Sequence, residues 1–420
     1  MTLEEIFKHN ANPIGVPVFS ELAWADINSK YTKNQIRTGL ANYIVANKIK
    51  FPLIDISYDT ITKRFIELKN INSTEFLINN FNGVVEKYDD YKYPFSKYGK
   101  HIIDLTKKYT PVSNYFQQEN RLSCSSYGFE SPIGIWNNQK LLEKMNWTFW
   151  RMGKKSISET DYRESFRLGT YTATQFKPNV AKCIYQLTEA KIICDTSCGW
   201  GDRLLGFYTT QKAESYYGCD PNDVVFETYK TQCIAYERLL GNDPKLVERD
   251  DWFECIGTKH VVIYRQPAED VIWPDVRFDC MFTSPPYFST EQYNKGGVNE
   301  QDQSWSRYSE YDKWKNGFYF PMVDSVWNKT KSGGFVCINI MDPQVKGIRY
   351  RASDDLVDYM KAKSDCHFLG QIGMRIKQRP INTSSGMKQH LSNVFIENVW
   401  CFSKDVVSSF HTPTLESLFI

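Results

Sequence analysis

The chain lacks any run of about 18 consecutive apolar residues, so the sequence predicts no membrane-spanning helix. Its first residues, Met1 to Glu5, have neither the basic nor the apolar region of a secretory signal peptide. Paired Cys-x-x-Cys spacing and Cys/His clusters are also absent, so we expect no metal ligation. The 11 cysteines are scattered, and several fall in apolar segments. We therefore expect reduced, packing cysteines and a cytoplasmic location.

The sequence contains no zinc-finger pattern, no homeodomain pattern and no internal repeat. Its composition, 41% hydrophobic and 24% charged residues, is typical of an ordinary globular protein. A length of 420 residues allows two domains, or one large domain with insertions. Charge is unevenly spread, because residues 1–160 hold 21 basic and 16 acidic residues, a balance of +5, against −3 for the remainder. A basic N-terminal part is compatible with phosphate contacts and equally with a solvated face.

Residues 1–160 are predicted to form a mixed or mainly helical domain, with an accessory or target-recognition role. Helical periodicity is found in three segments: Leu22–Asn28, Lys33–Lys48 and Ile61–Ile78. Between Tyr88 and Arg151, aromatic residues alternate with basic ones, as in Tyr91 to Phe95. Such residues either stack on bases and bind phosphates or form the core of a small domain, and both interpretations stand.

From about residue 161 the pattern changes to strands alternating with helices, which predicts an α/β fold with a mostly parallel sheet covered on both faces. This second domain should span residues 161–405 and leave a C-terminal tail at 406–420. The predicted strands number seven: Lys191–Cys194, Ser215–Cys219, His260–Tyr264, Arg277–Phe282, Gly334–Ile340, His367–Ile376 and Val394–Phe402. The predicted helices are Asp202–Tyr208, Asp223–Leu240, Ser309–Lys331 and Ser353–Lys363. Polar segments 289–308 and 378–392 are predicted to be loops beside the active edge.

The string Ser284-Pro285-Pro286-Tyr287 follows the fourth predicted strand directly. Two prolines end a strand, since neither donates a ladder hydrogen bond and both fix φ. The result is a rigid corner that carries a hydroxyl, a proline carbonyl and an aromatic ring. Its oxygens can accept hydrogen bonds from an amino group while the ring of Tyr287 stacks on a planar base.

A glycine-rich turn follows the first predicted strand. Gly199 and Gly201 permit a tight turn and close approach of the backbone to a ligand at a helix N-terminus. The dinucleotide fingerprint Gly-x-Gly-x-x-Gly is incomplete, because Leu204 stands where its third glycine would be. Asp195 ends the first strand and Asp220 ends the second, where its carboxylate is placed to accept hydrogen bonds from both hydroxyls of a ribose.

Together these segments resemble the S-adenosyl-L-methionine-dependent DNA amino-methyltransferases, which methylate the exocyclic nitrogen of cytosine or adenine. The resemblance implies a Rossmann-like methyltransferase fold over residues 161–405 and S-adenosyl-L-methionine as cofactor. It also implies a role in cofactor binding for a set of residues: Phe176, Lys177, Asp195, Ser197, Gly199, Gly201, Asp220, Ala268, Glu269 and Thr283. In this family the first acid and the glycine turn face the methionine part, the second acid holds the ribose, and Ala268-Glu269 flank the adenine.

The resemblance further assigns the chemistry to Ser284, Pro285, Pro286 and Tyr287. An exocyclic amino nitrogen is a poor nucleophile, because its lone pair is delocalised into the ring. Ser284 Oγ and the Pro285 carbonyl would accept hydrogen bonds from its two N–H groups, and Tyr287 would stack on the flipped-out base. The nitrogen would then attack the methyl group directly. Serine at the first position is associated mostly with N4 of cytosine, so we expect a DNA cytosine-N4 methyltransferase. Double-stranded DNA is the expected partner, and a restriction nuclease is a candidate second partner.

Three alternatives remain. Methylation of adenine N6, in DNA or RNA, is the nearest. A nucleic-acid-binding protein without activity would need the same fold, and the intact corner and the two acids argue against it. A protein or small-molecule methyltransferase is the third, and it is disfavoured because the Pro-Pro corner suits a planar substrate that carries an amino group. The string Glu397-Asn398-Val399 also occurs in cytosine-C5 methyltransferases, but those enzymes need a cysteine after a proline, and the chain has no Pro-Cys pair. We therefore interpret Glu397 as part of the sheet core.

Overall fold

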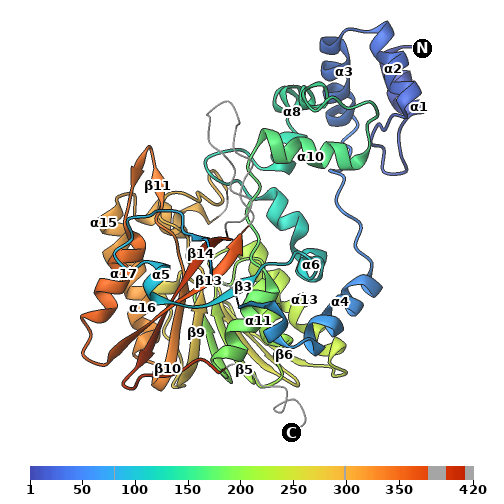
Figure 1. Cartoon of the computed structure of the whole chain (residues 1–420). Coiled ribbons are helices and arrows are strands. Elements are labelled where there is room, and N and C mark those ends of the chain that lie inside the picture. The colour runs from blue at the N-terminus through green and yellow to red at the C-terminus, as the bar shows by residue number, and fades with distance from the viewer. Residues whose placement is uncertain (80, 298, 377–393, 412–420) are drawn as a thin grey trace. The chain divides into compact units, whose positions relative to one another are not determined.

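The computed structural model describes residues 1–79, 81–297, 299–376 and 394–411 (Figure 1). The chain divides into two compact units. Unit 1 comprises Met1–Asp55, Gln118–Thr174 and Gln292–Val298, and unit 2 comprises Ile56–Gln117, Gln175–Glu291 and Asn299–Ile420. Unit 2 thus takes in residues 56–117, which the sequence analysis assigned to the N-terminal domain.

Unit 1 is helical in its described residues. Its helices are α1 (Leu3–His9), α2 (Glu21–Lys30), α3 (Lys33–Ala46), α7 (Pro132–Trp136), α8 (Gln139–Asn146), α9 (Thr148–Arg151) and α10 (Glu159–Gly169), with the last residues of α6 (Thr110–Ser123). The start of α3 follows from its capping box, in which the Thr32 hydroxyl and the Gln35 side chain satisfy each other's backbone N–H groups. Helices α2 and α3 confirm two of the predicted helices. Large aromatic side chains, Trp136 and Phe149 among them, form the core.

The sheet of unit 2 contains all seven predicted strands. They are β4 (Ile192–Asp195), β5 (Ser215–Cys219), β8 (His260–Tyr264), β9 (Phe278–Thr283), β10 (Thr330–Asn339), β13 (Cys366–Ile376) and β14 (Val394–Lys404). Their order is β8-β5-β4-β9-β10-β14-β13, and β14 runs antiparallel to both β10 and β13. The other neighbouring pairs in this series are parallel. This order and direction are those of the Rossmann-like methyltransferase fold, as predicted.

Five further strands in the described residues enlarge this sheet to twelve. They are β1 (Leu77–Ile78), β2 (Val84–Val85), β3 (Gly99–Asp104), β6 (Lys245–Glu248) and β7 (Trp252–Ile256). The hairpin of β6 and β7 extends the sheet beyond β8, and β3 extends it beyond β13, to which it is parallel. The sheet therefore includes strands from residues 77–104. The strands in that segment are short and flanked by polar residues. Their apolar and polar residues alternate over too few positions for the strands to be recognised from the sequence.

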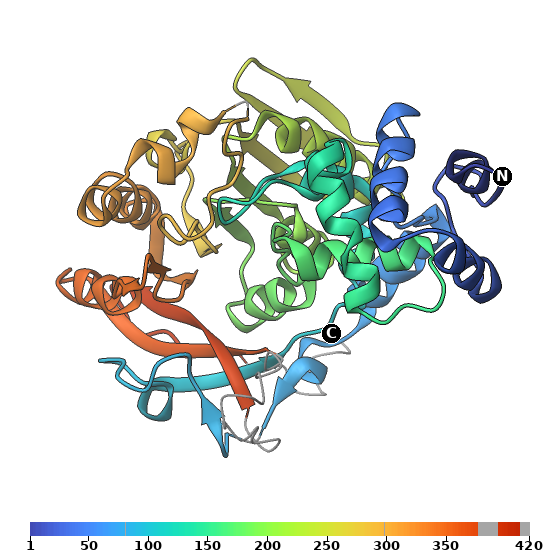
Figure 2. The same cartoon turned by 90° about the horizontal axis from the view of Figure 1, so that it is seen from above.

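Helices cover both faces of the sheet (Figures 1 and 2). On one face lie α4 (Tyr58–Asn70), α11 (Pro178–Leu187), α12 (Asp202–Tyr208) and α13 (Asp223–Leu239). On the other lie α16 (Phe320–Trp327) and α17 (Ala352–Lys361). Successive strand residues alternate between the two cores, since Cys280 packs into the first and Met281 into the second. Burial on both faces explains why the central strands are mostly apolar.

Two predicted helices are wrong at their ends. Helix α4 stops at Asn70, and the predicted remainder forms the 3-10 turn η1 (Ser73–Phe76) and strand β1, because Asn72 caps the turn at Thr74. The segment 309–331 divides into α15 (Tyr311–Trp314), the π-helix η4 (Lys315–Tyr319), α16 and the start of β10. The remaining short elements are α5 (Phe95–Tyr98), α14 (Ser304–Arg307), η2 (Ala268–Asp270), η3 (Glu300–Asp302), β11 (Gln344–Val345) and β12 (Ile348–Arg349).

Across the described ranges, no helix has the length and apolar character needed to cross a membrane. The eleven cysteines all lie in these ranges as free thiols, and ten of them are buried. Several alternate along the central strands, where a small apolar side chain fits between sheet and helix.

Candidate active site

Polar side chains gather where the central parallel strands end. Asp195 ends β4, Asp220 follows β5, Thr283 ends β9 and Asn339 ends β10. On one side of the sheet the strands that follow β4 are β5 and then β8. On the other side β9 lies next to β4 and is followed by β10. The carboxyl ends of β4 and β9 therefore border the point at which the strand order reverses, where open α/β sheets bind ligands.

The carboxylate of Asp195 is fully buried and holds this edge together. Its Oδ2 accepts hydrogen bonds from Arg203 Nε at 2.8 Å and from the Tyr216 hydroxyl at 2.6 Å. Its Oδ1 accepts from Thr283 Oγ1 at 3.1 Å and from the backbone N–H of Ser197 at 3.2 Å. Burial alone would lower the pKa of Arg203, but the attraction of Asp195 more than offsets it, and the pKa lies above its usual value. Asp195 thus ties the turn after β4 to the end of β9.

The turn at Gly199 and Gly201 has the conformation that its glycines predict. Both residues have positive φ, +59° and +76°, and Gly201 caps the N-terminus of α12. A Cβ on Gly201 would lie 2.6 Å from the end of the Gln232 side chain, so a larger residue would have to displace this side chain and adopt a strained positive φ. Tyr229 of α13 donates its hydroxyl to the Gly199 carbonyl, which fixes the turn from the other side.

Asp220 lies across from this turn and is held by backbone donors. Its Oδ2 accepts from the N–H of Gly199 at 2.9 Å, and its Oδ1 accepts from the N–H of Asn222 at 3.0 Å. Burial raises the pKa of Asp220 to about 6. The carboxylate is therefore positioned by two backbone groups and can titrate near neutral pH.

The segment at Phe176 and Lys177 lies against the same loop. The Phe176 ring packs edge-on against Phe282, with ring centroids 5.6 Å apart, and the Arg203 guanidinium lies 5.2 Å from its centre. Lys177 donates from Nζ to the Gln175 carbonyl at 2.7 Å. The structure thus brings Phe176 beside the end of β9, next to the buried Asp195–Arg203 pair.

Ala268 and Glu269 form part of η2, which follows β8. Ala268 is buried in the second core. The Glu269 carboxylate is also buried and pairs with Arg307 at 2.8 Å. Burial raises the pKa of Glu269 above its usual value. This acid therefore belongs to the carboxyl edge of the sheet, beyond Asp220.

The corner Ser284-Pro285-Pro286-Tyr287 begins one residue after Thr283. Ser284 donates its hydroxyl to Asn339 Oδ1 at 3.0 Å, and the Tyr287 hydroxyl donates to Glu397 Oε1 at 2.7 Å. Pro285 is buried, and Ser284 and Tyr287 are half-buried. Burial, together with the Glu397 carboxylate, raises the pKa of Tyr287 well above its usual value, so this side chain stays a phenol.

Asn339 and Glu397 are site residues that the sequence analysis missed. Glu397 was assigned to the sheet core, and the structure corrects this: β14 carries its carboxylate to the corner. The signal for Asn339 was present, because it is a polar residue at the end of an otherwise apolar strand, as Asp195 is. Glu397 gave no such signal, since its neighbourhood depends on the antiparallel pairing of β14 with β10.

Other candidate residues are not at the corner. Tyr91, Tyr93 and Phe95 of the aromatic and basic stretch are buried in the cores of unit 2, so they offer no surface for bases. Phe288, which directly follows the corner in the sequence, is 3% exposed and packs against Tyr311. The predicted loop 378–392 lies outside the described residues.

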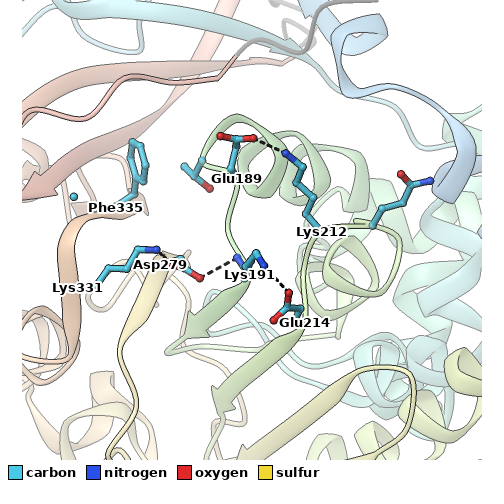
Figure 3. Close-up of a pocket in the computed structure, with 10 residues that line it drawn as sticks. Glu189, Lys191, Lys212, Glu214, Asp279, Lys331 and Phe335 are labelled. Atoms are coloured by element: carbon cyan, nitrogen blue, oxygen red, sulfur yellow. Dashed lines mark hydrogen bonds and ion pairs between the residues drawn. The ribbon is translucent and has the colours of Figure 1, made fainter. Parts of the chain in front are cut away.

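A depression of about 600 Å³ lies at the opposite edge of the sheet, around the amino ends of the strands (Figure 3). Three of its lysines are paired with three of its acids: Lys191 with Glu214, Lys212 with Glu189, and Lys331 with Asp279. The Asp279 carboxylate also accepts from the N–H of Ile192 at 2.7 Å. Its charges are thus balanced internally, and none of the predicted site residues lines it.

Comparison with known proteins gives a family match over the C-terminal third of the chain. Residues 278–415, from β9 to the last described residues and beyond, match the family model described as "DNA methylase", for N6 and N4 methyltransferases. The matched segment begins with β9 and contains the corner, Asn339 and Glu397. No curated protein matches the chain.

The solved structures that match the chain share little sequence with it. An rRNA methylase from Streptococcus thermophilus is 10% identical, with a TM-score of 0.30, and the match covers 55% of this chain and 99% of that one. TrmN from Thermus thermophilus is 11% identical, with a TM-score of 0.33 and coverage of 55% and 49%. Trm1 from Pyrococcus horikoshii, solved with S-adenosyl-L-methionine, is 15% identical, with a TM-score of 0.34 and coverage of 55% and 56%.

The strand order and the family match agree with each other. The order β8-β5-β4-β9-β10-β14-β13 is that of a Rossmann-like methyltransferase, and the family match covers β9, β10, β13 and β14, the strands around the corner. Residues 278–415 of the chain are thus similar to the DNA methylases of the N6 and N4 type.

Proposed function

We propose that this protein transfers a methyl group from S-adenosyl-L-methionine to N4 of a cytosine in DNA. One observation carries the proposal: consecutive residues at the end of β9 belong to two different groups of contacts. Thr283 donates to Asp195 on the side of the glycine turn, and Ser284 donates to Asn339 on the side of the corner. A cofactor held by the turn and a base held by the corner would therefore meet at this point of the chain.

The residues at the turn fit the proposed cofactor. Each of the two carboxylate oxygens of Asp220 accepts a hydrogen bond from one backbone N–H group. Each keeps a further lone pair that could accept from a ribose hydroxyl. Gly199 and Gly201 keep the backbone free of side chains beside it. Phe176, Lys177, Ser197, Ala268, Glu269 and Thr283 would complete the site, with Asp195 fixing the turn through Arg203. When bound, the cofactor supplies an electrophilic methyl group on its sulfonium.

The corner would hold the base and activate its amino group. Ser284 Oγ and the Pro285 carbonyl would accept hydrogen bonds from the two N–H groups of the amino nitrogen. These hydrogen bonds would turn the nitrogen lone pair toward the methyl group. Tyr287 would stack on the base, and its hydroxyl is already anchored on Glu397, so the ring costs little entropy to position. The base must leave the duplex stack to reach a corner that lies within the fold, which costs a few kcal/mol.

Cytosine is proposed as the base because the residue before the two prolines is serine. The competing activity is adenine-N6 methylation of DNA or RNA, and the family match includes both kinds of methyltransferase. We propose that unit 1 contributes to recognition of the nucleic acid. Within unit 1, the segment 292–297 contacts residues near Ser125, since Asn294 Oδ1 accepts from Cys124 Sγ at 3.2 Å. This segment begins five residues after Tyr287.

Nucleoside mass spectrometry tests the proposal directly. DNA and RNA from cells expressing the wild-type protein are digested and compared with material from cells expressing the Ser284→Ala variant. The proposal expects N4-methylcytosine in DNA from the wild type alone. N6-methyladenine would establish the competing activity, and a modified base in RNA would move the substrate from DNA to RNA.

A further inference from the structure

The side-chain amide of Asn339 has one orientation that satisfies its surroundings. Asn339 is 1% exposed, and its Nδ2 donates to Asn398 O at 3.0 Å and to Glu397 Oε1 at 3.2 Å. A backbone carbonyl and an ionised carboxylate only accept hydrogen bonds. The nitrogen must therefore face these two oxygens, and Oδ1 must face the corner.

This orientation decides where the hydroxyl protons of the corner lie. Oδ1 of Asn339 only accepts, so Ser284 Oγ, 3.0 Å away, donates its single proton to it. The Tyr287 hydroxyl lies 3.1 Å from the same Oδ1 but 2.7 Å from Glu397 Oε1, the shorter and charged contact. Tyr287 therefore donates to Glu397 and leaves Asn339 to Ser284. The Ser284 oxygen then presents only lone pairs to a substrate.

We propose that Asn339 and Glu397 are positioning residues that hold Ser284 as a hydrogen-bond acceptor and so make the corner select an amino base against its keto analogue. The inference rests on the proposed function in one respect, that Ser284 contacts the base. It applies equally to cytosine, with uracil as the keto analogue, and to adenine, with hypoxanthine. It thus explains selection of the amino group whichever base is methylated.

The physical basis is the mismatch between two acceptors. An amino group donates to Ser284 Oγ, whereas a keto oxygen at the same place faces a lone pair, and both oxygens lose a partner. A buried polar group left unpaired costs about 1–3 kcal/mol, and sites built to pair with a substrate group reject analogues that lack it. A serine with a free proton would not discriminate in this way, because its hydroxyl can rotate and donate to the keto oxygen.

The test compares binding of an amino and a keto base. A duplex carrying one site that the wild-type enzyme methylates is titrated with protein in the presence of S-adenosyl-L-homocysteine, and so is the same duplex with uracil or hypoxanthine as the target base. The replaced base also mispairs, which eases flipping, but this contribution is the same for each protein. The measured quantity is the affinity for the amino duplex divided by the affinity for the keto duplex. We expect Asn339→Leu to lower this ratio at least about fivefold relative to wild type, because about that factor corresponds to the loss of roughly one buried hydrogen bond.

Two further variants keep the result interpretable. Glu397→Gln retains the shape of the side chain but removes the charge, so Tyr287 competes for Asn339 Oδ1 and the same ratio should fall by a smaller factor. Asn179→Leu is the matched control, because Asn179 is also a buried asparagine that donates to a carbonyl, that of Asp104, and its ratio should equal the wild-type ratio. Unchanged ratios in both the Asn339 and the Glu397 variants would overturn the inference.

Failure of the proposed function shows itself separately. If the wild type methylates neither DNA nor RNA, the proposed function is wrong, and the inference is then decided by neutron diffraction of the protein exchanged into deuterated water. A deuterium on Ser284 Oγ directed at Asn339 Oδ1 supports the proton arrangement. A deuterium directed away from Asn339, or an inverted amide, overturns it.

Discussion

Cofactor binding should weaken as the pH falls through about 6, because the proposed ribose contact needs an ionised Asp220. Each oxygen of this carboxylate already accepts one backbone N–H, and burial raises its pKa to about 6. Hydrogen bonds to a charged group contribute about 1.5–3 kcal/mol, against about 0.5–1.5 kcal/mol for neutral pairs. Losing about 1 kcal/mol at each of two hydroxyls amounts to about 2 kcal/mol, or roughly a 30-fold weaker affinity well below pH 6.

The measurement is calorimetric titration of the protein with S-adenosyl-L-methionine at several values between pH 5 and pH 8. Wild-type affinity should be constant above about pH 7 and fall below pH 6, with proton uptake or release visible as a dependence on the ionisation enthalpy of the buffer. Asp220→Asn should bind weakly at every pH, because its side chain cannot titrate. Glu269→Gln is the control, since burial also raises the pKa of Glu269, and this variant should keep the fall near pH 6. A wild-type affinity that does not change between pH 5 and pH 8 would refute the assignment of Asp220.

Four other outcomes can be measured with single changes. Ser284→Ala should lower the rate of methyl transfer about 10²–10³-fold with little change in cofactor affinity, as judged by single-turnover rates and calorimetry, and weaker cofactor binding would contradict its placement at the base. Arg203→Leu should lower the free energy of unfolding by about 3–5 kcal/mol in urea titrations, because it leaves the Asp195 carboxylate buried without its cation, and a loss below about 1 kcal/mol would contradict that pairing. Folding disfavours the ionised form of Asp220, so the free energy of unfolding of the cofactor-free protein should decline as the pH rises from about 4 to about 7. The decline should exceed that of Asp220→Asn by up to about 3 kcal/mol. Equal pH profiles of the two proteins would exclude the raised pKa. A fragment of residues 161–420 should fail to fold, because it lacks β3 and the core residues Ile61, Phe65 and Ile103, and a folded, soluble fragment would show these contacts to be dispensable.

The catalytic half of the fold was predictable because its signals are local. Runs such as Phe278–Phe282 are apolar except for Asp279, since helices cover both faces of the sheet, and they alternate with helices of period 3.6. Gly199 and Gly201 were identifiable for a related reason: a backbone with positive φ accepts few other residues. The resemblance to amino-methyltransferases then placed Asp195, Asp220 and Ser284 at strand ends, and the structure puts all three at the carboxyl edge.

The membership of residues 77–104 in the sheet depends on pairing between distant segments. Strand β3 pairs with β13, some 270 residues later in the chain, and nothing in the local sequence of either strand specifies the other. The same distance explains why the sequence left two roles open for Tyr91 and Tyr93, base stacking and core packing. They are buried because α17 and β14 lie over them, as in the hydrogen bond from the Tyr93 hydroxyl to Asp358.

The sequence by itself determined the seven core strands in chain order, the glycine turn and the serine-proline corner, because each depends on neighbouring residues whose conformations are restricted by backbone geometry and periodicity. Only the tertiary structure decided what surrounds the corner. Glu397 reaches Tyr287 across 110 residues, and Asn339 reaches Ser284 across 55, through the pairing of β10 with β9 and β14. Hydrogen bonds between side chains on separate strands depend on register, and register is set by the packing of the whole sheet.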